Sequence, residues 1–207
     1  MEKHTGIIIY LTLIFMVSFS IGSFGSGSWN VDLVSKIGGN CYTVAVQSTF
    51  AYIAYRDELH ILNISNPASP QLVGVLALPT EGNKVVVNGA YAYIAVGWSG
   101  LIIADISDPA NPVEVGQYTI AGWADDIAVS GNYVYLADLV YGLRIIDVSN
   151  PSSPNEVKFI GTSDSAIGIA VQGQYAYLLD WGYGLRVIDI HNPVNAWQVG
   201  YCALGGG

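Results

Sequence analysis

Apolar residues occur along this chain in short runs separated by Gly, Asn, Ser and Pro, and the order of these runs repeats. Each repeat holds three runs rich in Val, Ile and Tyr and then a more polar run, which is typical of β-strands joined by turns. The first run of each repeat begins at one of Val44, Val85, Ile127 and Ile169. The polar fourth run is centred on one of Val73, Val115, Val157 and Val199.

Prolines fix the register of the repeat. The segments ILNISNPASP, IADISDPANP, IIDVSNPSSP and VIDIHNPVNA align without gaps, and their first prolines stand 42 residues apart at Pro67, Pro109, Pro151 and Pro193. Four antiparallel strands in about 42 residues match one blade of a β-propeller. We therefore predict an all-β fold with four four-stranded blades over residues 31–207, at 42–79, 83–121, 125–163 and 167–205.

Tyrosines on the second strand give the expected packing. Tyr91 and Tyr93 are two residues apart, share one face of a strand, and should pack against the neighbouring blade. Blades that pack face to face bury their inner strands on both sides. This explains a composition of 52% hydrophobic and 11% charged residues without a membrane-embedded fold.

The N-terminal segment has the features of a secretory leader. Lys3 and His4 precede the apolar run at 6–19, and small residues follow it. We predict a signal peptide over residues 1–27, and hence a secreted or cell-surface protein. After the leader is removed, no apolar stretch approaches the roughly 20 residues needed to span a bilayer.

The third strand and its turn carry a family resemblance. The segments GLRIIDVSNPSSP from Gly142 and GLIIADISDPANP from Gly100 resemble the LVIVD repeat of bacterial and archaeal surface proteins, over about residues 31–204. The resemblance implies a propeller in a secreted or cell-surface setting, and it implies no catalytic residues. In the first repeat, Glu58 stands where the other repeats have the glycine before the third strand, and Asn63 stands where they have the aspartate at its end. The first blade should therefore be the least regular.

The count of strands indicates an incomplete ring. Residues 31–40 resemble an additional outer strand, so the chain holds five outer strands but four sets of inner strands. We therefore expect a partial or truncated propeller, with apolar faces at both ends that favour self-association; the alternative is a closed four-bladed ring, at the small extreme for propellers. Cys41 and Cys202 lie in the first and last repeats; they either form a bridge across the ring or are two unpaired thiols, and we favour the thiols.

A repeated carboxylate precedes the proline turn of three blades. Asp105, Asp147 and Asp189 are 42 residues apart and could be taken for metal ligands. A carboxylate at this position also caps the turn by accepting a backbone N–H two residues further on. Because a binding site is usually built once, whereas this residue recurs, we interpret the three aspartates as structural turn caps and predict no metal site among them.

Residues that differ between blades mark the candidate binding site. The loop after the second strand and the loop entering the next blade should open on the same rim, near the central channel. Aromatic and acidic residues gather in these loops: Trp98, Trp123, Asp125, Asp126, Asp138, Tyr141, Asp180, Trp181 and Tyr183. This mixture suits stacking on sugar rings or holding a cation such as Ca²⁺. The alternative interpretation is that the tryptophans pack on neighbouring loops and the acids keep the surface soluble.

The net charge and the types of polar side chain limit the classes of partner and of function. A net charge of −9 argues against nucleic acid and anionic membranes, and leaves proteins, carbohydrates or cations as partners. His60 and His191 form no recognisable catalytic arrangement, and pairing Asp125 or Asp126 with Asp138 or Asp180 for glycoside hydrolysis is no better than any random pair of acids. We expect a binding module that is not an enzyme and has no required cofactor. The alternatives are spacer repeats of a larger envelope protein or, third, a hydrolase.

Overall fold

The computed structural model describes residues 41–203, and these residues form four four-stranded antiparallel sheets, each with its strands hydrogen-bonded in chain order. The first blade contains β1 (Cys41–Gln47), β2 (Phe50–Tyr55), β3 (Glu58–Asn63) and β4 (Gln71–Ala77). The second contains β5 (Lys84–Asn88), β6 (Tyr91–Ala95), β7 (Leu101–Asp105) and β8 (Val113–Tyr118).

The last two blades repeat this arrangement. The third contains β9 (Ala124–Ser130), β10 (Tyr133–Asp138), β11 (Gly142–Asp147) and β12 (Asn155–Gly161). The fourth contains β13 (Ala166–Gln172), β14 (Tyr175–Asp180), β15 (Gly184–Asp189) and β16 (Trp197–Cys202), with the 3-10 helix η1 (Pro193–Asn195) before its last strand. The prediction of an all-β fold with four four-stranded blades is confirmed.

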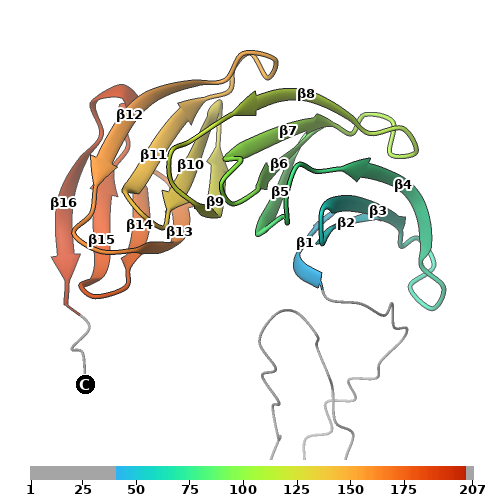
Figure 1. Ribbon diagram of the computed structural model, residues 1–207, viewed down its shortest axis with the longest axis horizontal. Coiled ribbons are helices and arrows are strands. Elements are labelled where there is room, and N and C mark those ends of the chain that lie inside the picture. The colour runs from blue at the N-terminus through green and yellow to red at the C-terminus, as the bar shows by residue number, and fades with distance from the viewer. Residues whose placement is uncertain (1–40, 204–207) are drawn as a thin grey trace, which may run out of the picture.

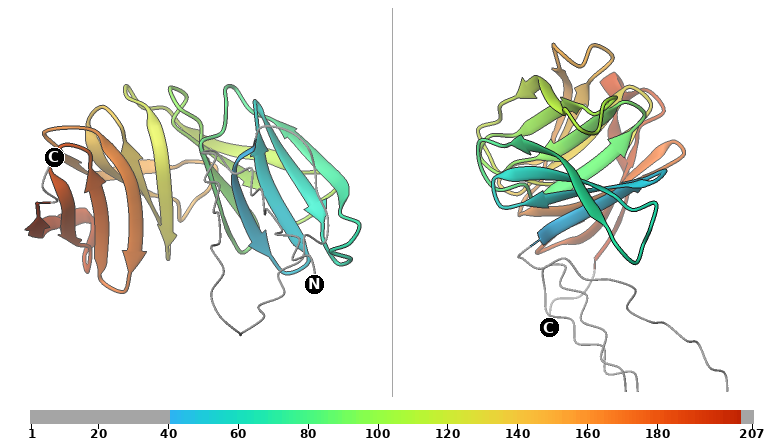
Figure 2. Two further views of the ribbon diagram at one scale, coloured as in Figure 1. Left: turned by 90° about the horizontal axis from the view of Figure 1, so that it is seen from below. Right: turned by 90° about the vertical axis from the view of Figure 1, so that its right-hand side faces the viewer.

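The blades follow one another around an open arc (Figure 1). The first strand of each blade lies on the concave side of the arc, and the fourth strand lies on the convex side (Figure 1). Figure 2 shows the first and fourth blades at opposite ends of this arc. The predicted leader at residues 1–27 and the predicted outer strand at 31–40 lie outside the described residues.

The hairpin between the first two strands requires a left-handed backbone. Gly89, Gly131 and Gly173 supply it in the last three blades, with φ of 62°, 57° and 60°. The first blade has Ser48 at the same place, with φ of 56°. Ser48 and Arg56 are the two non-glycine residues with positive φ in residues 41–203, and both lie in the first blade, whose repeat also departs from the others in sequence.

Three apolar cores lie between successive blades. Tyr52, Tyr93 and Tyr135 occupy one repeat position and pack toward the next blade, where they are 2%, 4% and 2% exposed. Neighbouring positions on the same strand, such as Ile94 and Leu136, pack toward the preceding blade. In the second and third blades, which have a neighbour on each side, the second strand is thus buried on both faces, as predicted, and burial raises the pKa of Tyr135 to about 12.

On the convex side, the fourth strand of one blade touches the proline turn of the next. A Cβ at Gly116 would overlap the carbonyl oxygen of Pro151, and a Cβ at Gly74 would overlap that of Pro109. Glycine is therefore needed at these two positions for close approach of the backbones. Within residues 41–203 no helix is long and apolar enough to cross a bilayer.

Candidate binding rim

Two sets of loops meet on one edge of every blade. Leu139, after β10, donates its N–H to the carbonyl of Trp123 in the loop that enters the third blade, at 2.9 Å. Trp181, after β14, donates in the same way to Ser165 at 2.8 Å. We use the name loop rim for the edge formed by the loops at residues 55–58, 78–83, 96–100, 119–123, 139–141, 162–165 and 181–183.

Aromatic side chains project from this loop rim in three blades. Trp181 is 75% exposed, Trp98 is 59% exposed, and Tyr141 and Tyr183 are each 44% exposed. Trp123 is half-buried and meets Trp98 edge to face, with ring centroids 5.5 Å apart. A large exposed aromatic surface is uncommon unless it contacts a ligand or partner, so these four side chains form the part of the rim that is available for binding.

Asp138 lies beneath the rim rather than on it. Its side chain is completely buried, and Oδ1 accepts the N–H groups of Trp123 at 3.2 Å and Val140 at 3.1 Å. Its Oδ2 accepts a hydrogen bond from Arg144 Nε at 2.8 Å. The carboxylate therefore ties the two loops together and is already balanced by a guanidinium.

The Arg144 guanidinium is held from several sides. It donates to Glu156 Oε2 at 2.8 Å, and its Cζ lies 5.0 Å from the centre of the Phe159 ring and 6.0 Å from that of Tyr141. Burial alone would lower the pKa of Arg144, but its hydrogen bonds to Glu156 and Asp138 outweigh burial and raise the pKa. Arg144 thus stays charged and supports the Tyr141 ring from below.

The fourth blade repeats this arrangement with one difference. Arg186 Nε donates to the buried Asp180 Oδ2 at 2.6 Å, and its Nη1 donates to Gln198 Oε1 at 2.9 Å. The guanidinium also lies 5.9 Å from the centre of the Tyr183 ring. Asp180 Oδ1 is buried and has no hydrogen-bond partner within the described residues, whereas the equivalent oxygen of Asp138 has two.

Asp125 and Asp126 lie at the start of β9 on the channel side of the rim. Asp126 joins three blades, because it lies 3.2 Å from Lys84 Nζ and accepts the Ile169 N–H at 3.0 Å. Asp125 is half-buried, and burial and then the neighbouring Asp126 charge raise the pKa of its carboxyl, against a hydrogen bond with Trp123. Asp126 is thus occupied by structural contacts.

The repeated aspartates lie on the opposite edge of the blades. Asp105, Asp147 and Asp189 each accept the backbone N–H of the residue two positions further on, at 2.8 Å in every case. These are the bonds that the turn-cap interpretation requires. Hydrogen bonds with Ser107 lower the pKa of Asp105, and those with Ser149 lower the pKa of Asp147.

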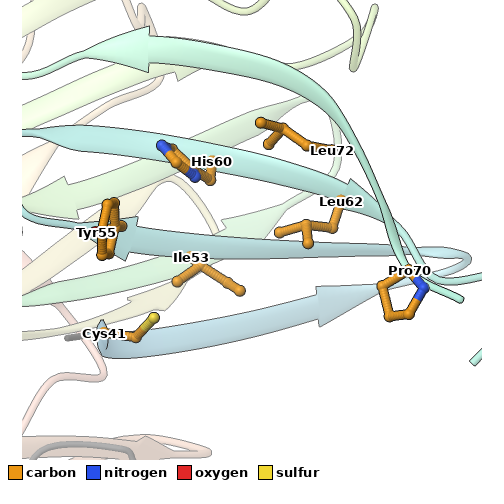
Figure 3. A pocket seen from close by; sticks show the side chains of 7 residues that line it. All are labelled: Cys41, Ile53, Tyr55, His60, Leu62, Pro70 and Leu72. Carbon is orange, nitrogen blue, oxygen red and sulfur yellow. The ribbon is translucent and has the colours of Figure 1, made fainter. Parts of the chain in front are cut away.

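A second concave feature lies on the face of the first blade that turns away from the second. It is an apolar hollow of about 340 Å³, and Figure 3 shows side chains from all four strands of the blade around it: Cys41, Ile53, Tyr55, His60, Leu62, Pro70 and Leu72. His60 Nε2 lies 2.7 Å from Glu58 Oε2. Cys41 and Cys202 are both free thiols.

Sequence reasoning did not identify Arg144 and Arg186. The sequence did contain a signal for them. Both arginines stand at the repeat position of the buried Ile102, and an aspartate six residues before each stands at the repeat position of the buried Val96. A charged pair that appears together at two otherwise apolar positions indicates a buried ion pair. Among residues 41–203, no group of three or more His, Cys, Asp or Glu side chains is placed to hold a metal ion.

Comparisons with known proteins agree with this architecture. The family model described as LVIVD repeat matches the chain four times, over residues 38–77, 81–120, 121–162 and 164–203. The computationally designed Ika4 protein superposes with a TM-score of 0.65 at 12% identity, over 83% of this chain and 99% of Ika4. The designed Ika8 protein gives the same TM-score and identity, over 77% of this chain and 49% of Ika8. No curated protein matches the chain.

Proposed function

The chain belongs to the LVIVD repeat family, and we propose that it acts as an exported binding module whose loop rim holds a neutral carbohydrate by stacking on aromatic side chains. The observation that carries the proposal is the set of exposed aromatic rings on equivalent loops of consecutive blades: Trp98, Tyr141, Trp181 and Tyr183. Flat aromatic faces at the mouth of a rigid β-scaffold suit sugar rings, which present apolar C–H faces.

Three of the four rings are supported from below, which favours binding over incidental exposure. Trp98 contacts the edge of Trp123, and Tyr141 and Tyr183 lie over arginines whose guanidinium groups are fixed by buried carboxylates. A side chain held in one position loses less conformational entropy when a ligand binds. The rim is therefore partly preorganised for a ligand.

The acidic residues of the rim support stacking more than cation binding. Asp138 and Asp180 are paired with Arg144 and Arg186, and Asp126 is engaged by Lys84 and by backbone. With a net charge of −9, the surface favours neutral or positively charged ligands over anionic polysaccharides.

A glycan array followed by titration calorimetry tests the proposal. Trp181→Ala should weaken binding of a neutral oligosaccharide by roughly tenfold or more, since loss of a stacked aromatic costs on the order of 1–3 kcal/mol. Trp197→Ala is the matched control, because Trp197 is 61% exposed but begins β16, away from the loop rim. Binding that is unaffected by Trp98→Ala and Trp181→Ala would refute the carbohydrate site. Capture of a protein ligand by the same rim would move the assignment to a protein partner.

Export rests on the basic start and apolar run of residues 1–27, and has its own test. N-terminal sequencing of the protein recovered from the culture medium or cell surface should find a chain that begins shortly after the apolar run. Recovery of the intact N-terminus from the cell interior would refute export without bearing on the loop rim.

A further inference from the structure

The two ends of the arc each present a face that elsewhere lies between blades. In each of the three cores, residues of one blade that face forward meet residues of the next blade that face backward. The first blade has an uncovered backward face, and the fourth blade has an uncovered forward face, within the described residues. We call these the backward end face and the forward end face; the left panel of Figure 2 shows both blades from that side.

Equivalent residues show what is uncovered on the forward end face. Tyr135 and Leu143 of the third blade are 2% and 0% exposed, because they pack on the fourth blade. Tyr177 and Leu185 stand at the same repeat positions of the fourth blade and are both partly exposed. Leu179 is 41% exposed on the same face, where its equivalent Ala137 is fully buried.

The backward end face is uncovered in the same way. Val44 is 41% exposed, whereas Val85 and Ile127 at the equivalent positions are 1% and 2% exposed. Ile53 lines the apolar hollow of Figure 3, whereas the equivalent Ile94 is fully buried in the core between the first two blades. The hollow thus lies where forward-facing side chains of the preceding blade pack in the inner cores.

A glycine on the forward end face specifies the kind of blade that fits there. Gly74 and Gly116 are glycines because the proline turn of the next blade lies directly against them. The third blade has Lys158 at this position, and it faces the altered turn HNPVNA, which lacks the second proline and forms η1. Glycine therefore goes with a regular turn that has two prolines, and lysine goes with the altered one.

Gly200 is the fourth residue of this series. The atoms nearest to a Cβ built on it belong to Val187 of its own blade, at 3.5 and 3.7 Å, so nothing in residues 41–203 requires glycine there. The regular two-proline turn that is left without such a neighbour is that of the first blade, with Pro67 and Pro70. Pro70 also lines the hollow on the backward end face.

From these observations we infer that the forward end face binds the backward end face of a second copy of this chain, with Gly200 of one copy against the Pro67 turn of the other. The contact continues the series of blade-to-blade cores already present in the chain. Both end faces turn toward the open side of the arc (Figures 1 and 2), so a second arc, rotated by half a turn, meets both at once. The assembly is a closed pair that carries two loop rims.

Gly200→Lys tests the contact without disturbing the blade. Lysine is the residue of the third blade at this position, and the space around Gly200 accommodates a Cβ. Sedimentation equilibrium of the purified chain should give twice the protomer mass, and Gly200→Lys should weaken the pair by roughly tenfold or more. Val113→Lys is the control, because Val113 is 56% exposed on the convex side of the second blade and should leave the pair intact.

Mixing two variants separates this contact from general loss of structure. Gly200→Lys changes the forward end face, and Val44→Asp changes the backward end face, so each variant should pair with itself more weakly than the parent does. A mixture should pair more strongly than either variant alone, because one intact contact joins the two copies. A protein that is monomeric at all concentrations, or variants that pair as well alone as the parent does, would overturn the inference. Carbohydrate binding at the loop rim is measured separately, and neither result depends on the other.

Discussion

Replacing Arg144 by isoleucine removes the guanidinium that neutralises the buried carboxylate of Asp138. That carboxylate is 0% exposed, and Arg144 Nε is the donor to its Oδ2 at 2.8 Å. Breaking a buried pair by removing one partner typically costs about 3–5 kcal/mol, because the remaining charge is left without compensation. The two backbone N–H groups that Asp138 Oδ1 accepts are retained, so we expect a loss of about 3 kcal/mol, at the lower end of this range.

The second blade provides the template for a double variant. Val96 and Ile102 occupy the positions of Asp138 and Arg144, and both are fully buried. Asp138→Val with Arg144→Ile therefore installs a solution that the same fold already uses. The double variant still loses two backbone hydrogen bonds, worth about 0.5–1.5 kcal/mol each. It should nevertheless be more stable than the sum of the single losses predicts, with a coupling energy of about 1–3 kcal/mol.

Urea denaturation of the parent, both single variants and the double variant gives the four free energies of unfolding that this cycle needs. In a protein of this size each kcal/mol corresponds to a shift of roughly 2–4 °C in Tm, which calorimetry can measure independently. A cost below about 1 kcal/mol for Arg144→Ile, or losses that simply add, would refute the argument that the pair is buried and coupled.

Three further predictions concern the stability of the blades. Gly116→Ala should destabilise the protein by about 1–3 kcal/mol, because its Cβ would overlap the Pro151 carbonyl. Gly161→Ala is the control and should change stability little, because the nearest atom to its Cβ is 3.7 Å away. Equal effects of the two variants in urea denaturation would contradict the close approach. Ser48→Gly should raise the free energy of unfolding by up to ~1 kcal/mol, because glycine adopts a φ of 56° without strain. A thermal scan should show a higher Tm, and a lower Tm would show that the turn is not strained. Burial raises the pKa of Asp125, which penalises its ionised form in the folded state. Asp125→Asn should therefore be more stable than the parent at neutral pH, and this advantage should disappear as pH falls below about 4; an advantage that persists in acid would exclude this cause.

The repeat made most of the fold predictable from sequence. The alignment at Pro67, Pro109 and Pro151 fixed the register, and alternation around Tyr91 and Tyr93 gave the direction in which the strands pack. Both signals are local, so one chain was enough to interpret them. The prediction of apolar faces at both ends followed from the same count of strands, and the exposed Val44 and Leu179 agree with it.

The candidate site was harder to predict, because loop composition does not show which way a side chain points. Asp138 ends β10 and Trp98 lies in the loop after β6, but the carboxylate is buried under the rim, whereas the indole is 59% exposed on it. The partner that decides this is Arg144, six residues away on the next strand, where the side-chain alternation suggests an apolar residue. The one sequence signal for the buried carboxylate was that an aspartate and an arginine appear together at these two repeat positions in the third and fourth blades.

Two kinds of position at the contacts between blades differ in how well they tolerate amino-acid substitution. Val96 and Ile102 give way to a charged pair in the third blade without altering the sheets around them, because the two positions change together and the arginine neutralises the aspartate. Gly116 has no such freedom, since its neighbour is the backbone of another blade and no side-chain exchange within its own blade can make room. Chemistry can therefore diversify at the loop rim while the outer strand and the proline turn keep the spacing of the arc. By the same reasoning, a glycine such as Gly200 that faces no backbone of its own chain points to backbone supplied by a partner.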